Sequence, residues 1–164
     1  MATRQYCTPE WLEESARLYP LTPRFKKEFS KLTTKICFKI NAEPAWGIER
    51  AIIFGAFVNK GELEKLAFFS EQDAVKEADF ILAATPQEWK KILRKDNKFV
   101  TDFMLGKLVL EHGSKVGVLS IAPHANSFVD ALTQFDLQFP DEMSAEELEL
   151  FRSYQNQFRV KLGV

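Results

Sequence analysis

The stretch "DFILAATPQEWKKILRKDNKFVTDFMLGKLVLEHG", residues 79–113, decides the fold. Its first part, residues 79–85, is apolar on both faces and predicts a strand that is covered on two sides. "TPQE" (85–88) then combines a capping threonine, a proline at the first helical position and a glutamate at the third, which is a capping-box pattern. The helix that it opens presents three large apolar side chains on one face: Trp89, Ile92 and Leu93.

A second helix is expected in "KFVTDFML" (98–105), and Gly106 would end it. Asp102 is expected on the polar side of this helix. The opposite, apolar arc consists of Phe99, Val100, Phe103 and Met104. "KLVLEHG" (107–113) then alternates as a strand does, and Gly113 allows the next turn. One face of that strand is expected to hold Leu108, Leu110 and His112.

Three more strands are predicted upstream of this stretch. "KICFKIN" (35–41) alternates cleanly, and its apolar face consists of Ile36, Phe38 and Ile40. "RAIIFGAFVNKGELEKLAFFSE" (50–71) predicts a hairpin whose turn lies at residues 59–61, because Asn and Gly tolerate positive φ. The first arm is apolar on both faces, which indicates a central strand. Gly55 in this arm either lets another group approach the backbone closely or forms a bulge.

Helix starts recur along the rest of the chain. Thr8–Pro9 and Thr22–Pro23 each place a capping threonine before a proline at the first helical position. Ser144 opens a last helix through a second capping box. Ser114 can cap a helix in "KVGVLSIA", which we favour over a strand although its glycine weakens that prediction. Strands followed by helices in this order predict an α+β or mixed-sheet single domain.

The composition is that of a soluble globular chain with an unusual aromatic content. The 164 residues include 15 Phe against 3 Tyr and 3 Trp, and a ring without a polar group suits an apolar interior or an apolar pocket. A formal net charge of -1 gives no electrostatic basis for binding nucleic acid. The longest apolar run (51–58) is too short to span a bilayer, and residues 1–11 contain no apolar signal core. We therefore expect a cytoplasmic protein.

Motifs of catalysis and metal binding are missing from the sequence. It contains no GxSxG, GxxxxGK[ST], GxGxxG or HExxH pattern. Cys7 and Cys37 form no CxxC pair, and His112 and His124 are expected to be ordinary surface or half-buried residues. We therefore expect a protein that is not an enzyme and needs no cofactor or metal. The basic segment 90–98 is expected to be a solvated face, with an anionic head group or membrane surface as the functional alternative.

The whole run "DFILAATPQEWKKILRKDNKFVTDFMLGKLVLEHGSKVGVL" resembles the sterol carrier protein (non-specific lipid-transfer) domain family. The similarity rests on the order strand, polar cap, amphipathic helix, second helix and glycine-bounded strand. Four residues stand in the family's places: Gly106, Lys107, Leu108 and Gly113. The resemblance covers residues 23–135, which leaves helical extensions at 1–22 and 136–164. It implies an α+β domain with a five-stranded mixed sheet covered by helices that enclose an apolar tunnel.

The resemblance also implies a function, namely non-enzymatic binding or transfer of a fatty acyl chain, acyl-CoA, phospholipid or sterol-like ligand. The tunnel is predicted to be lined by Phe54, Phe68, Phe80, Leu82, Phe99, Phe103, Met104, Leu108 and Leu110. Asp102 departs from the family pattern, in which a small apolar residue is common, and it either faces solvent or marks a different pocket mouth. Transient membrane contact and a homodimer are further expectations. The last helix (144–162) could either cover the tunnel or form the dimer contact.

Two other functions remain open at this point. The chain could be an accessory or dimerising module of an enzyme complex of lipid or isoprenoid metabolism, as the family's domain also occurs in larger enzymes. It could instead be a small acyl-thioester enzyme of another α+β fold. A lipid site needs at least about 300 Å³, and an empty apolar void of that size would cost about 7 kcal/mol. A tunnel should therefore be occupied, collapsed or open to water at one end.

Overall fold

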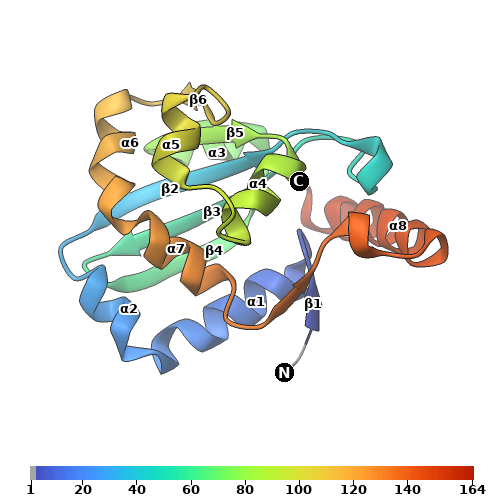
Figure 1. Cartoon of the computed structure of the whole chain (residues 1–164), viewed down its shortest axis with the longest axis horizontal. Coiled ribbons are helices and arrows are strands. Elements are labelled where there is room, and N and C mark those ends of the chain that lie inside the picture. Colours follow the sequence, from blue (N-terminus) through green and yellow to red (C-terminus); the bar gives the residue numbers. More distant parts are fainter. Residues whose placement is uncertain (1–2) are drawn as a thin grey trace.

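The computed structural model describes residues 3–164 and contains a five-stranded mixed sheet with helices packed on it (Figure 1). The strand order is β4-β3-β2-β5-β6, in which β2 and β5 are parallel and all other neighbours are antiparallel. The strands are β2 (Thr33–Ile40), β3 (Ile52–Asn59), β4 (Glu62–Phe69), β5 (Phe80–Ala84) and β6 (Val109–His112). This arrangement confirms the predicted α+β class and the mixed five-stranded sheet.

Helices cover the two faces of the sheet unequally. One face carries α3 (Glu71–Glu77), whose Ala74 packs on a small apolar layer that includes Cys37, Ile53 and Phe57. The other face carries the larger core. The helices of the larger layer and its surroundings are α1 (Pro9–Leu18), α2 (Pro23–Glu28), α4 (Pro86–Leu93), α5 (Phe99–Met104), α6 (Lys115–Ile121), α7 (Ala125–Leu132) and α8 (Ala145–Leu162). A candidate site for an apolar ligand is therefore expected on this second face.

The hairpin forms as the sequence predicted. Lys60 and Gly61 both have positive φ, 48° and 87°, as a two-residue turn between twisted strands requires. The first arm, β3, is buried on both faces until its last residue, which confirms that it is a central strand. A Cβ on Gly55 would lie 2.5 Å from the ring of Phe69, so this glycine serves close approach. The irregularity in pairing lies elsewhere, between Phe57 and Val58.

Helix caps explain most of the helix starts. Thr8 accepts a hydrogen bond from the Trp11 N–H, and Ser144 forms the complete capping box that was predicted. The Thr85 hydroxyl accepts from the Glu88 N–H at 3.2 Å, which is the first half of its predicted box. Thr22 precedes α2 as predicted, but its hydroxyl makes no cap bond to that helix. Ser114 caps α6, which confirms a helix there and excludes the strand alternative.

The predicted orientation of α5 was wrong. Its buried side chains are Phe99 and Asp102, whereas Val100 and Met104 are exposed. Asp102 turns inward because the Asn97 side chain donates to its carboxylate at 3.1 Å. The Asp102 carbonyl also accepts the N–H groups that follow the helix end. Asp102 therefore neither faces solvent nor opens a pocket mouth, and it fixes the turn into β6.

Both ends of the chain join the main core. A pair of strands that the sequence did not predict, β1 (Thr3–Gln5) and β7 (Asp136–Gln138), runs parallel and ties residues 3–5 to the segment after α7. The Gln155 side chain of α8 donates to the Cys7 carbonyl at 2.7 Å. Arg159 donates to the Arg50 and Ala51 carbonyls, which anchors α8 beside the loop before β3. No helix within residues 3–164 combines the length and the apolar character that crossing a bilayer requires.

Candidate functional site

An apolar cavity lies between the main face of the sheet and the helices that cover it. Its volume is about 40 Å³. Strands β2 and β3 supply its floor, and helices α1, α4, α5, α6 and α7 supply its walls. It is lined by Tyr6, Trp11, Phe38, Phe54, Trp89, Ile92, Leu93, Phe99, Ile121, Ala125, Phe128, Val129 and Leu132.

Aromatic rings fix the shape of the floor. Phe38 and Phe54 are directly opposite in β2 and β3, and their rings stack with centroids 5.0 Å apart. The Trp11 ring meets Phe54 edge-on at 5.1 Å, and the Trp89 ring meets Phe38 almost perpendicularly at 5.6 Å. Offset and edge-to-face contacts of this kind are the preferred arrangements of aromatic pairs. The strand alternation and the two N-terminal cap positions of α1 and α4 bring these four rings together.

The polar atoms of the lining are turned away from the cavity. The Trp11 indole N–H donates to the Leu132 carbonyl at 2.8 Å, and the Trp89 indole N–H donates to the Lys39 carbonyl at 3.0 Å. Burial raises the pKa of the Tyr6 phenol well above its usual value, so this side chain stays neutral. No ionised side chain lines the cavity. The space can therefore receive an apolar group but offers no ion pair to a polar head group.

The cavity is much smaller than a lipid tunnel. A volume of about 40 Å³ holds at most a few water molecules, whereas small-molecule sites span about 300–1,000 Å³. At roughly 24 cal/mol per Å³, a void of 40 Å³ costs about 1 kcal/mol and a void of 300 Å³ about 7 kcal/mol. An empty space of tunnel size would therefore cost far more free energy than the observed cavity, and this structure contains no open tunnel among its described residues.

Two of the nine predicted pocket residues, Phe54 and Phe99, line the cavity. Four others belong to the apolar layer that continues from it along β5 and β6: Phe80, Leu82, Leu108 and Leu110. Leu82 pairs with Phe38 across β5 and β2, so this layer is continuous with the floor of the cavity. A space that widens toward β6 would reach these four side chains.

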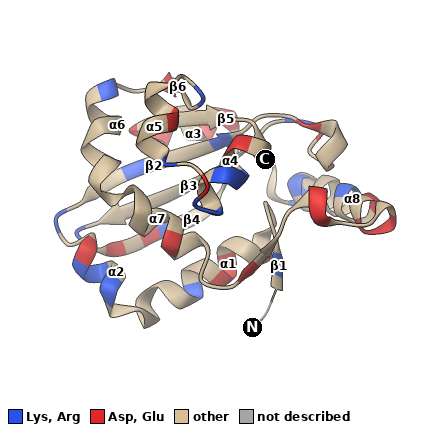
Figure 2. Cartoon of the chain, in the orientation of Figure 1, with Lys and Arg blue, Asp and Glu red and all other residues tan. Residues whose placement is uncertain are grey.

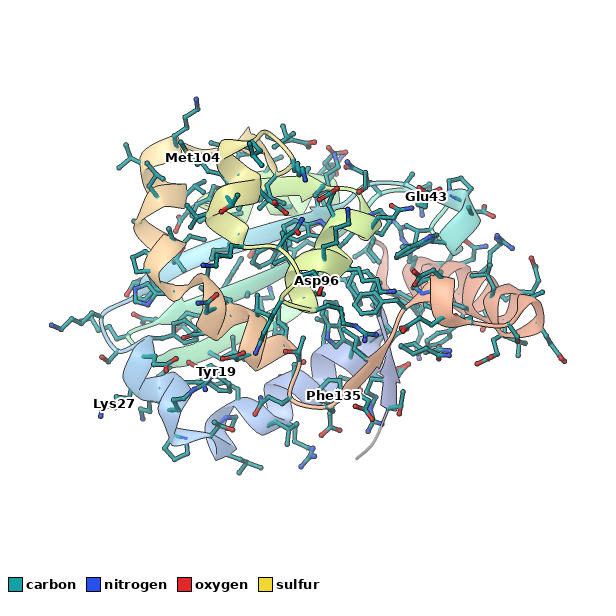
Figure 3. The ribbon with its side chains drawn as sticks, in the orientation of Figure 1. Tyr19, Lys27, Glu43, Asp96, Met104 and Phe135 are labelled. Atoms are coloured by element: carbon teal, nitrogen blue, oxygen red, sulfur yellow. The ribbon has the colours of Figure 1, made fainter. Side chains whose placement is uncertain are left out.

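The remaining three predicted residues lie apart from the cavity. Phe103 is half-buried and packs on the edge of the core. Met104, which is labelled in Figure 3, lines no space in this structure, because its side chain is 72% exposed. Phe68 packs against Phe158 of α8, with ring centroids 5.3 Å apart, and lines a groove between α1, β4 and α8.

Most of the cavity wall comes from residues outside the predicted pocket. The apolar face of α4 was predicted, but as an ordinary helix face. In α7 the wall residues are Ala125, Phe128, Val129 and Leu132. Their i, i+3, i+4, i+7 spacing is the sequence pattern that could have identified them. Trp11 had no such pattern, because its place above the sheet depends on how residues 3–22 fold back onto the sheet.

The reactive side chains of the chain are separated from one another. Cys7 and Cys37 are both buried free thiols. Burial raises the pKa of the Cys7 thiol and raises that of Cys37 to about 12, which leaves both as poor nucleophiles. His112 and His124 are half-buried on different elements. Within residues 3–164, no three His, Cys, Asp or Glu side chains are grouped as metal ligands.

The basic segment 90–98 is largely neutralised within the molecule. Lys90 and Arg94 pair with Asp141 and Glu142 at 2.8 Å each, which joins α4 to the turn before α8. Lys95 pairs with a carboxylate of α7 at 2.5 Å. These contacts favour the solvated face over the head-group site for most of this segment.

Comparison with solved structures shows the same fold in sterol carrier proteins. A solution structure from Thermus thermophilus, of a conserved hypothetical protein suggested to be a sterol carrier protein, superposes with a TM-score of 0.67 at 18% identity. The match covers 80% of this chain and 90% of that one. A crystal structure of sterol carrier protein 2 gives a TM-score of 0.61 at 18% identity, over 76% of this chain and 92% of that one.

A sterol carrier protein 2-like protein from Aedes aegypti matches with a TM-score of 0.51 at 13% identity, over 74% of this chain and 98% of that one. No protein-family model matches the sequence, and no curated protein is detectably similar to it. The chain therefore has the sterol carrier protein 2 fold, as its sequence pattern predicted.

Proposed function

We propose that this protein binds and carries a lipid without catalysing a reaction. The observation that carries the proposal is the cavity itself: an apolar space between sheet and helices, whose two lining indole N–H groups donate to backbone carbonyls outside it. Solved structures with this fold are described as sterol carrier proteins, which agrees with a lipid as the ligand. Affinity would come from burial of the apolar part of the ligand, at about 0.8 kcal/mol per CH₂ group.

The polarity of the site limits the ligand class. A ligand with one long apolar part and one polar end fits, because the polar end can remain at the surface while the apolar part enters. A fatty acyl chain, an acyl-CoA, a phospholipid chain and a sterol all meet this condition. A ligand that is charged along its length does not, since burying an unpaired charge is costly.

Binding requires the space to widen, and α5 and α6 are the walls that can yield. They have only six and seven residues. Helices this short are not stable by themselves and depend on packing against the rest of the fold. Glycines with positive φ, Gly106 and Gly113, bound the strand between them. Displacing α5 and α6 would extend the cavity along the apolar layer of β5 and β6. The predicted residues of that layer would then contact the ligand.

The chain contains its own reporters for this proposal. Trp11 and Trp89 line the cavity, whereas Trp46 lies in the turn Pro44–Trp46 outside it. A fatty acid brominated in mid-chain quenches indole fluorescence only near contact. We expect it to quench the wild type and the Trp46→Phe variant strongly. The double variant Trp11→Phe, Trp89→Phe retains only Trp46 and should be quenched little.

The matched variants also define how the proposal fails. Strong quenching of the double variant would place the ligand near Trp46 and α8, outside the cavity. Absence of quenching in all three proteins, together with a bare polypeptide mass in native mass spectrometry, would exclude a lipid ligand. The accessory-module function would then be tested by searching for an enzyme that co-purifies. A lipid-mass adduct that organic extraction removes would support the carrier function and identify the ligand class.

A further inference from the structure

Large apolar side chains are exposed on α5, on the residue that follows it, and on α6. Five of them form what we call the α5–α6 surface: Val100, Met104, Leu105, Val116 and Leu119. Met104, Leu105 and Val116 are 72%, 66% and 76% exposed. Such residues are common singly on protein surfaces, but neighbouring ones mark interaction sites.

The two helices present these side chains on the same side of the molecule. Phe99 of α5 and Ile121 of α6 line the same cavity, so both helices pack on the same sheet face with their buried sides toward it. Their exposed sides must therefore both point away from the sheet. In Figure 3, Met104 lies at the end of α5.

Positive charge surrounds this surface. Lys98 precedes α5, Lys107 follows its terminal glycine and Lys115 begins α6, and all three are exposed. Within residues 3–164, none of the three forms an ion pair, unlike the lysines of α4. Of the nearby carboxylates, Asp102 is buried and Glu111 pairs with Lys39 at 2.9 Å, while Asp96, two residues before Lys98, is exposed. Beyond its first residue α6 carries no charge, as its tan ribbon in Figure 2 shows.

We propose that the α5–α6 surface docks on a bilayer that contains anionic phospholipid. Apolar side chains flanked by unpaired lysines match the two components of such a surface, its acyl boundary and its negative head groups. The rest of the molecule supplies no general attraction, because the formal net charge of the chain is -1. Binding must therefore come from this local combination. Docking would also place the two shortest walls of the cavity against the membrane.

Vesicle sedimentation tests the proposal without any ligand in the cavity, so it can fail or succeed independently of the proposed lipid binding. We expect the protein to bind vesicles of phosphatidylcholine mixed with phosphatidylglycerol, and to bind vesicles of phosphatidylcholine alone more weakly. Leu105→Asp and Val116→Asp should each weaken binding by about tenfold. Lys107→Gln and Lys115→Gln should each weaken vesicle binding by about fivefold. Added salt screens the lysines, so it should reduce the difference in affinity between the wild type and these two variants.

Leu150→Asp is the matched control. Leu150 is 68% exposed, nearly the same as Leu105, but it lies on α8 beside Glu146, Glu147 and Glu149. Its substitution should leave vesicle binding unchanged. All these side chains are exposed, so cooperative thermal unfolding should persist in every variant and can be checked directly.

Three results would overturn the proposal. The first is that both Leu105→Asp and Val116→Asp bind vesicles as tightly as the wild type. The second is that the control Leu150→Asp loses as much vesicle affinity as they do. The third is no vesicle binding by the wild type. If the wild type then sediments as a dimer that Leu105→Asp dissociates, the α5–α6 surface is an interface between two copies of this chain.

Discussion

Replacing Ala125 with valine tests the cavity and its role together. Ala125 is the first residue of α7 and lines the cavity, so two added methyl groups have an empty space of about 40 Å³ to enter. Filling that void recovers at most about 1 kcal/mol at roughly 24 cal/mol per Å³. The lower helix propensity of valine opposes this gain by about 0.5 kcal/mol. We therefore expect Ala125→Val to raise the free energy of unfolding by about 0.5 kcal/mol.

The same substitution should weaken lipid binding. Valine occupies the space that an entering acyl chain would fill first, so the chain must displace two more buried methyl groups, at about 0.8 kcal/mol each. The expected loss of affinity is about tenfold. Unfolding is measured by calorimetry, where the melting temperature should rise by about 2 °C for a chain of this size. Affinity is measured by titration with the brominated fatty acid.

Ala131→Val in the same helix is the control, because Ala131 packs on the core without lining the cavity. It should not increase stability, and it should leave the affinity for the fatty acid unchanged. A destabilised Ala125→Val would mean that the void is absent in solution. A stabilised Ala125→Val with wild-type affinity would refute the cavity as the entry point of the ligand.

Two further predictions concern stability. Gly113 and Gly106 both have positive φ, but a Cβ on Gly113 would lie 2.4 Å from a backbone carbonyl oxygen, while a Cβ on Gly106 meets nothing within 4 Å. In urea titrations, Gly106→Ala should lower the free energy of unfolding by about 1–2 kcal/mol, and Gly113→Ala by about 3 kcal/mol or more. Burial opposes ionisation of Asp130, but its bonds to Lys95 and Arg24 outweigh this and lower its carboxyl pKa. Its ion pairs therefore stabilise the fold above the pKa of the unfolded chain, about 4, and this contribution is lost as the pH falls through the lower folded value. Asp130→Asn should be less stable at neutral pH, with a smaller further loss on acidification; an unchanged acid profile would contradict the assignment.

The sequence predicted the fold well where local rules decide it. Alternation in "KICFKIN" and the tight turn after Asn59 determine which residues of β2 and β3 face the core. Side-chain direction in α5 was predicted less well. Its six residues span less than two turns. The apolar periodicity therefore could not exclude that the helix is rotated about its own axis so that Asp102 is buried. The bond from Asn97 decides that rotation, and such a bond cannot be recognised from apolar spacing.

The sequence by itself determined most of the elements, the mixed α+β class and the apolar character of the interior, because these depend on periodicity, caps and composition. The short β1–β7 pair was decided by tertiary contact. The tertiary structure decided which apolar residues share a space. Trp11 and Phe54 are far apart in the chain, yet their rings meet over the cavity, while Phe68 and Met104 lie elsewhere. The physical reason is that burial depends on every element that packs nearby. A single segment specifies which of its faces is apolar, and only the assembled fold specifies what that face contacts.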